Sequence, residues 1–158
     1  MILISPDMSL VLAERLLAGV RTAAATHGVT LAAAVVDRGG NPVASARMDG
    51  AQLGAARLAL DKAFTAVAFG QPTAAWSEST APGGSDWGLG TSLGGRVVVF
   101  PGGLPVVVNG ALVGGLGVSG SASEVDAACA EAALNGAVAQ FGVAESAIVA
   151  TPGAEGHQ

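Results

Sequence analysis

The chain has 158 residues, of which 51% are apolar and 12% charged, and its formal net charge is −5. These values exclude a disordered chain and predict one domain, residues 1–158, with a core between about 9 and 141. The chain has only seven lysine and arginine residues, all at or before Arg96. This argues against a nucleic-acid partner or an anionic membrane, both of which require clustered cations. The scarcity of charge also favours a homo-oligomer with apolar interfaces.

The N-terminal half is predicted to form a helix, a hairpin and a second helix. The first helix runs from about Ser9 to His27, because Ser9 can cap it and Gly28 is typical after a last turn. Two strands, 31–37 and 42–48, flank the turn sequence RGGN and predict a hairpin. The second helix spans about 52–69 and is apolar on two faces, one for the sheet and one for another helix or subunit. The first face holds Leu53, Leu60, Phe64 and Val67, and the second holds Leu58 and Phe69.

The C-terminal half is predicted to begin with a functional loop, 71–95, which is rich in small and polar residues and holds both tryptophans. Three strands follow, at 96–100, 104–108 and 111–119, and the Asn-Gly pair at 109–110 predicts a type I′ turn. Such turns interrupt the uncharged stretch 101–120 and exclude a membrane-spanning helix there.

The last predicted helix runs from Ser123 to about Phe141. Ser123 and Asp126 have the spacing of a capping box, with aspartate in the usual glutamate position. The tail, 151–158, is predicted to be flexible. The resulting order, α-β-β-α-loop-β-β-β-α, predicts an α+β fold with a five-stranded antiparallel sheet flanked by helices.

The sequence predicts a cytoplasmic protein. Its first ten residues lack the basic region and the long apolar run of a secretion signal. The single cysteine, Cys129, has no internal partner for a disulfide, and the C-x-x-C spacing typical of zinc sites is absent. We therefore expect no metal site.

Lys62 is the only lysine and lies on the second predicted helix among apolar neighbours. Burial would lower its pKa and produce a usable base or nucleophile. The favoured interpretation is structural: the side chain either extends to water or pairs with a carboxylate.

Arg47 and Asp49 lie where the second strand leads into the second helix. Arg47 could hold a ligand carboxylate and Asp49 could cap the helix, although a structural pair between the two is the simpler interpretation. Gly102, Gly103 and Ser119 lie in two glycine-rich segments whose N–H groups could bind an anion or simply allow the chain to turn.

His27 has two interpretations. An imidazolium at the C-terminal end of a helix is stabilised by the helix dipole, and this is the default role. The alternative is axial ligation of haem, because imidazole is a common haem ligand and the chain has no tyrosine. His157 lies in the predicted tail, and Met48 is a weaker candidate ligand through its thioether.

Four motifs in this order, AVVDRGGNPVASARMDGA, LDKAFTA, PGGLPVVVNGALVGGLGVSG and SEVDAACAEAAL, resemble the GlcG/HbpS family, which includes the C-terminal domain of PduO-type adenosyltransferases. The resemblance covers about residues 9–141 and implies a profilin-like sheet, assembly into dimers or larger oligomers and, for several members, haem binding. The family's motif residues Arg47, Asp49, Lys62, Gly102, Gly103 and Ser119 are present. The chain departs from haem-binding members in its scarcity of histidine.

These observations lead to three hypotheses. The first is an oligomeric small-molecule-binding protein whose ligand is haem or another tetrapyrrole, in a pocket between the Arg47–Asp49 turn, the Lys62 helix and the two glycine-rich segments. His27 is its candidate imidazole ligand, and Met48 is the weaker alternative. The second is a metal-free isomerase, lyase or cyclase acting on a small carboxylated metabolite. In that case Arg47 would hold the carboxylate, and Lys62 or Asp49 would move the proton. The third is a ligand-free interaction scaffold.

Overall fold

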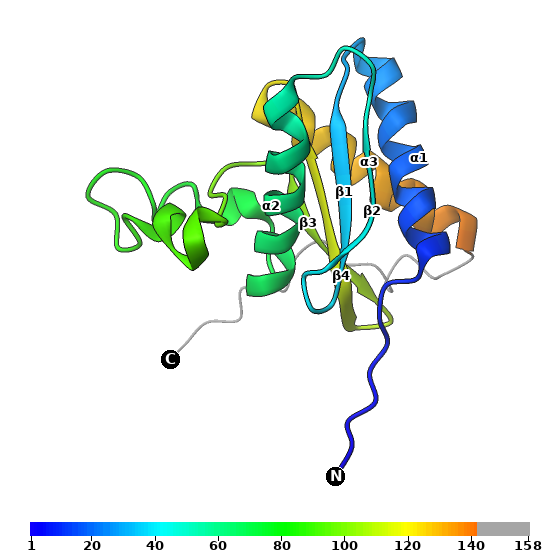
Figure 1. Ribbon diagram of the computed structural model, residues 1–158, viewed down its shortest axis with the longest axis horizontal. Coiled ribbons are helices and arrows are strands. Elements are labelled where there is room, and N and C mark those ends of the chain that lie inside the picture. Colours follow the sequence, from blue (N-terminus) through cyan, green and yellow to red (C-terminus); the bar gives the residue numbers. More distant parts are fainter. Residues whose placement is uncertain (142–158) are drawn as a thin grey trace.

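The computed structural model describes residues 1–141, with side chains through Ala137, and an antiparallel sheet lies at its centre. The sheet has four strands in the order β2-β1-β4-β3 (Figure 1). Each neighbouring pair is antiparallel, and the register shifts once in the β1–β2 pair and once in the β3–β4 pair. The strands are β1 (Ala32–Asp37), β2 (Pro42–Arg47), β3 (Gly103–Val108) and β4 (Ala111–Ser119).

Helices cover both faces of the sheet and complete a three-layer α+β fold. Helices α1 (Leu10–His27) and α3 (Ser123–Phe141) pack on one face, and α2 (Leu53–Phe69) packs on the other (Figure 1). The main core lies between the sheet and the α1–α3 pair, and it is built mainly from leucine, valine and alanine. The predicted tail, 151–158, lies outside the described residues.

The ends of α1 form as predicted. The hydroxyl of Ser9 accepts a hydrogen bond from the backbone N–H of Leu12 at 3.1 Å, which satisfies one free donor of the first turn. Gly28 ends the helix with φ of 66°, a left-handed conformation that glycine adopts at little cost. The predicted turn between β3 and β4 is also present, with positive φ at both Asn109 and Gly110.

The predicted strand at 96–100 is wrong, so the sheet has four strands instead of five. Val97 and Val98 are buried, as their apolar side chains suggest, but they pair with no strand. The backbone N–H of Val98 instead donates to the Thr65 hydroxyl at 3.0 Å, and that hydroxyl lies 3.2 Å from the carbonyl oxygen of Arg96. The segment is therefore attached to α2.

Helix α2 packs on the sheet through its alanines, because its backbone lies almost directly on β4. A Cβ atom at Gly117 would lie 1.9 Å from the carbonyl oxygen of Ala59, and one at Gly115 would lie 2.2 Å from that of Ala63. The predicted apolar face of α2 is only partly correct, since Val67 is buried but Leu53 is 82% exposed. Because the α2 backbone lies so close to β4, only short side chains fit between the helix and the sheet.

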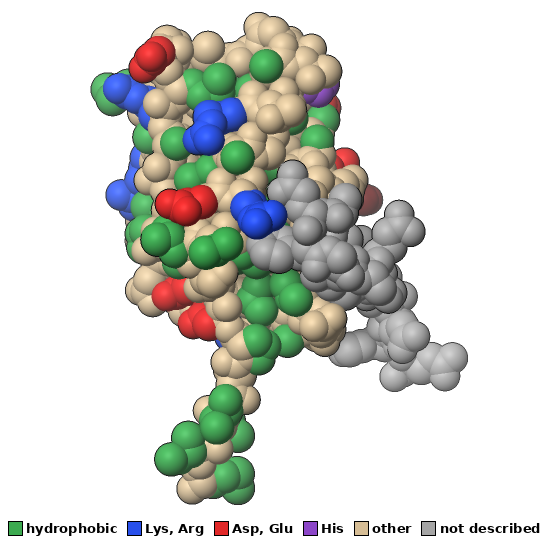
Figure 2. Space-filling model, turned by 90° about the vertical axis from the view of Figure 1, so that its right-hand side faces the viewer, with side chains coloured by type: hydrophobic (Ala, Val, Ile, Leu, Met, Phe, Trp, Pro, Cys, Tyr) green, Lys and Arg blue, Asp and Glu red, His purple; other side chains and the backbone are tan. Residues whose placement is uncertain are grey.

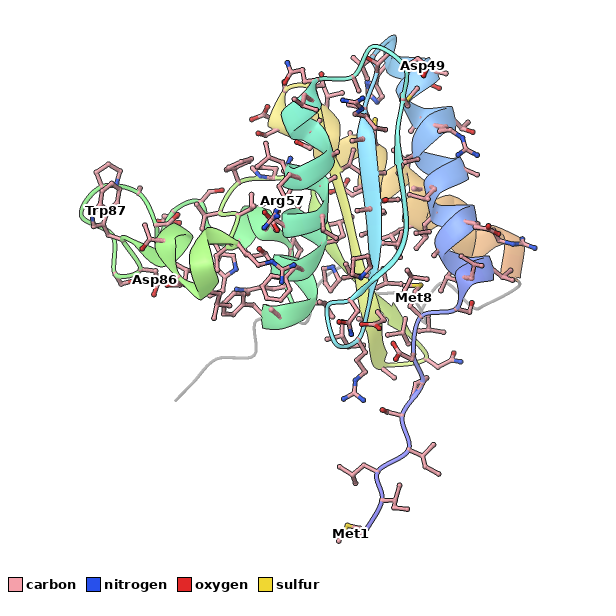
Figure 3. All side chains as sticks on the ribbon, viewed as in Figure 1. Met1, Met8, Asp49, Arg57, Asp86 and Trp87 are labelled. Atoms are coloured by element: carbon pink, nitrogen blue, oxygen red, sulfur yellow. The ribbon has the colours of Figure 1, made fainter. Side chains whose placement is uncertain are left out.

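The segment between α2 and β3 projects from the body of the molecule (Figure 1). It contains three short 3-10 turns, Thr73–Trp76, Leu89–Thr91 and Leu93–Gly95, in place of longer elements. Trp76 packs edge-on against Phe69 with ring centroids 5.2 Å apart. Trp87 lies toward the outer end of the loop and is 66% exposed (Figure 3).

Two surface features bear on possible partners. The apolar side chains of Met1–Ile4 project from the body and are almost fully exposed (Figure 2). On the face in that view, lysine and arginine side chains are scattered and form no continuous basic patch. Within residues 1–141, no helix combines the length and the apolar character needed to span a bilayer.

The close packing of α2 on β4 predicts opposite effects for two glycine-to-alanine substitutions. Gly117→Ala would force the α2 backbone away from the sheet, and we expect it to lower the free energy of unfolding by about 1–3 kcal/mol. Gly54→Ala has open space around the new Cβ and should be neutral or stabilising by up to about 1 kcal/mol. Chemical denaturation measures the unfolding free energy of both variants. Equal changes in the two variants would show that α2 packs less closely on β4 than described.

Candidate functional site

A buried ion pair lies at the centre of the candidate site. The Lys62 ammonium on α2 donates to the Asp126 carboxylate on α3 at 3.0 Å and to the carbonyl oxygen of Val118 on β4 at 2.9 Å. Both charged side chains are at most 2% exposed. The prediction that Lys62 pairs with a carboxylate is therefore confirmed, and the pair connects three elements.

Burial is the main influence on the charge of Lys62. Removal from water lowers the pKa of its ammonium below the ordinary 10.5, and the nearby Asp126 carboxylate opposes this shift. The ring of Phe100 lies 5.2 Å from Nζ and adds a cation–π contact. In this arrangement the ammonium has no contact with solvent, so any chemistry at Lys62 would first require the surrounding residues to move.

Asp126 was not predicted as part of the site, because its spacing from Ser123 suggested a capping box. One carboxylate oxygen does accept a hydrogen bond near the start of α3, from the backbone N–H of Ser121 at 3.0 Å. The other oxygen binds Lys62. The sequence signal that could have identified this role is the presence of a single lysine, which needs a counter-ion when it is buried.

Gly102 and Gly103 form a wall beside the ion pair. A Cβ atom at Gly102 would lie 2.6 Å from Nζ of Lys62, and one at Gly103 would lie 2.5 Å from the Lys62 carbonyl oxygen. The backbone N–H of Gly103 donates to the hydroxyl of buried Thr73 at 2.9 Å. These glycines therefore provide space for the lysine.

The other side of this wall opens into a groove of about 410 Å³, which we call the β3-edge groove. It lies between the first 3-10 turn, the start of β3 and α3. Its lining residues are Pro72, Ala74, Ala75, Gly102, Gly103, Leu104, Ala127 and Glu131. The volume falls within the range of small-molecule sites, and the lining is mainly apolar.

Arg47, Met48 and Asp49 lie at the opposite end of β2 from its turn with β1 (Figure 3). Arg47 and Asp49 are exposed and form no ion pair with each other within residues 1–141. The half-buried thioether of Met48 lies 3.4 Å from the backbone N–H of Leu31, which donates to it. The simple structural pair between Arg47 and Asp49 is therefore absent from this part of the chain.

Ser119 is buried at the same end of the sheet. It lies opposite Ala32 in the pairing of β1 with β4, and Ala32 lies opposite Arg47 in the pairing of β1 with β2. Arg47 and Ser119 thus belong to one row across the sheet, whereas Gly102, Gly103 and Lys62 form a separate group beside the β3-edge groove.

His27 is exposed at the end of α1, next to a second groove of about 350 Å³ between α1 and α3. We call this the α1/α3 groove. The helices cross closely at this point, since a Cβ atom at Gly19 would lie 2.9 Å from the Cα of Ala133. The lining residues are Arg15, Ala18, Gly19, Thr22, Ala23, Thr26, Ala132, Ala133, Gly136 and Ala137.

Residues 8–135 match the family model described as haem degrading protein HbpS-like. The chain belongs to the HbpS-like family. The predicted resemblance to the GlcG/HbpS family is therefore confirmed. Within residues 1–141, no group of histidine, cysteine, aspartate or glutamate side chains could hold a metal ion.

Relatives of known structure share the fold over most of the chain. Protein ORFY of Klebsiella pneumoniae is 34% identical, with 87% of this chain and 95% of that one covered and a TM-score of 0.85. The structure of a PduOC–haem complex is also 34% identical, with 82% and 94% covered and a TM-score of 0.79. Corrinoid adenosyltransferase PduO of Salmonella typhimurium is 39% identical over 106 residues, and the match spans 67% of this chain but only 32% of PduO.

The buried ion pair should dominate the stability of this region. Lys62→Met leaves the Asp126 carboxylate buried without a counter-ion, and we expect it to lower the free energy of unfolding by about 3–5 kcal/mol. Asp126→Leu added to Lys62→Met removes the orphaned charge and should recover much of the loss. Arg57→Met breaks the more exposed Arg57–Asp61 pair and should cost less than about 1 kcal/mol. A Lys62→Met protein as stable as Arg57→Met would contradict the account.

The lowered pKa of Lys62 also predicts a pH dependence of stability. Below pH 10.5 there is an interval in which the unfolded chain keeps the Lys62 proton while the folded chain has lost it. The unfolded state then binds more protons, so the contribution of Lys62 to stability rises with pH in that interval. The measurement is the difference in unfolding free energy between the native chain and Lys62→Met, from neutral pH up to 10.5. A flat or falling difference would refute the shift.

Proposed function

We propose that the protein binds haem or another tetrapyrrole along the α1/α3 groove, with the imidazole of His27 as axial ligand. The observation that carries this proposal is a row of residues on α1. Arg15, Gly19, Ala23 and His27 follow one another at intervals of four and so share one face of the helix. The first three line the groove, and His27 continues the row beyond it.

The residues of the groove fit a flat macrocycle in two respects. Its walls are mainly glycine and alanine, whose small size leaves space beside the helices. The row begins with Arg15, a residue type suited to a propionate carboxylate, and ends with an exposed imidazole. Haem would supply an iron centre that can bind a further ligand or carry an electron.

The family and its relatives support the same ligand. The family description refers to haem degradation, and one relative has been solved as a haem complex. The groove is open to solvent along one side, so a second copy of the chain that covered this side would exclude water from the macrocycle. Homo-oligomer formation is therefore part of this proposal, and Met48 remains a second candidate ligand.

An enzyme acting on a small carboxylated metabolite is the second candidate function. It is supported by Lys62, whose lowered pKa suits a proton-transfer group. In this version Arg47 would bind the carboxylate, and Asp49 is the other candidate base. Because Lys62 is buried, while Arg47 and Asp49 are exposed, the reaction would require a rearrangement that brings these groups to one ligand.

Titration of the purified protein with haemin tests the leading proposal. We expect a shifted and saturable Soret band, because an imidazole ligand changes the electronic state of the iron. His27→Ala should lose this shift and weaken binding at least about tenfold, which corresponds to about 1.4 kcal/mol. The matched control is His157→Ala, which removes the other imidazole of the chain.

Two results would overturn the proposal. One is the absence of any Soret shift in the native chain at saturating haemin. The other is an unchanged Soret shift in His27→Ala, which would assign ligation to another residue. Loss of the shift in Met48→Leu but not in His27→Ala would transfer the axial role to the thioether.

A further inference from the structure

We infer that the β3-edge groove is a separate binding site for a small molecule that carries a protonated amine on a short apolar body. This inference goes beyond tetrapyrrole binding, because none of the described residues lines both the β3-edge groove and the α1/α3 groove. Helix α3 contributes Ala127 and Glu131 to the β3-edge groove, and Ala132 and Gly136 to the α1/α3 groove. The two grooves thus lie along different faces of the same helix.

The floor of the β3-edge groove is apolar and rigidly supported. Gly102 and Ala127 separate it from the Lys62–Asp126 pair, since a Cβ atom at Gly102 would lie 2.6 Å from Nζ and Ala127 follows Asp126 on α3. Two opposite charges at 3.0 Å largely compensate each other, so the buried pair contributes little net charge to the groove. An alkyl group can therefore rest on Ala74, Ala75 and Leu104 without meeting an uncompensated charge.

The backbone of β3 offers a hydrogen-bond acceptor in the groove. The backbone N–H of Val118 donates to the carbonyl oxygen of Gly102 at 2.9 Å. In an antiparallel pair, hydrogen-bonded and non-hydrogen-bonded positions alternate. Gly103 and Gly117, which lie opposite each other, are therefore a non-hydrogen-bonded pair. The N–H and C=O of Gly103 therefore point away from β4. The N–H donates to Thr73, whereas no residue outside the sheet, within 1–141, donates to the carbonyl oxygen.

Among the described residues that line the groove, Glu131 supplies the only charged side chain. It is exposed and forms no ion pair within residues 1–141. An uncompensated carboxylate and a backbone carbonyl both accept hydrogen bonds, so together they favour a donor with positive charge. The net charge of −5 repels anions and attracts cations over longer distances. An alkylammonium ion fits this combination of an apolar floor and acceptor groups.

Binding of n-butylammonium to the full chain tests the inference, with backbone amide NMR shifts as readout. We expect saturable shifts at Gly102, Gly103 and Ala127, which line the groove, and no comparable response to butyrate. Glu131→Gln keeps the side-chain size but removes the charge, and it should weaken binding about tenfold. The control is Glu124→Gln, because Glu124 is an exposed carboxylate on the same helix that is not among the residues lining the groove. The Glu124→Gln protein should bind n-butylammonium with the affinity of the native chain.

A second variant tests the cavity itself. Ala127→Leu places a larger side chain in the groove and should abolish the shifts at Gly102 and Gly103 while haemin binding at the α1/α3 groove remains. The inference is overturned if butyrate produces the same shifts, if Glu131→Gln binds n-butylammonium as the native chain does, or if the shifts lie elsewhere. The haemin titration tests the α1/α3 groove, and the n-butylammonium titration tests the β3-edge groove. The failure of one proposal can therefore be distinguished from the failure of the other.

Discussion

The buried contact of Lys62 with Asp126 and the Val118 carbonyl is the interaction on which the candidate sites depend. It connects α2 with β4 and α3, which lie far from α2 in the sequence, and α2 and α3 pack on opposite faces of the sheet. An ammonium in this position is stable only while its counter-ion and its carbonyl partner stay in place. The geometry of these three elements is therefore strongly coupled, and the wall of the β3-edge groove is part of the same arrangement.

Close backbone packing is the second constraint, and it explains the unusual glycine and alanine content. Gly115 and Gly117 let α2 lie directly on β4, and Gly102 makes room for the lysine ammonium. On the opposite face, Gly19 lets α1 and α3 cross closely. Because the neighbouring side chains are short, shallow grooves remain beside α3, and these grooves are the candidate binding sites.

Much of the fold could be predicted from local sequence, whereas the site could be predicted only in part. Caps such as Ser9 and Gly28 and the Asn-Gly turn act through neighbouring residues, so the sequence located them well. Val97 and Val98 were mistaken for a strand because burial, which the sequence does indicate, does not specify pairing. Asp126 was missed because its partner lies 64 residues away. Spacing carries no information about such a contact.

The most direct test of the central claim is an NMR observation of the Lys62 ammonium, which is a single signal because the chain has one lysine. The account predicts side-chain protons that exchange slowly with water, because Nζ is buried and hydrogen-bonded to Asp126 and Val118. It also predicts that Asp126→Asn, which keeps the side-chain size but removes the charge, shifts this signal and speeds the exchange. A signal that exchanges as fast as a free lysine, or one that Asp126→Asn leaves unchanged, would contradict the buried pair.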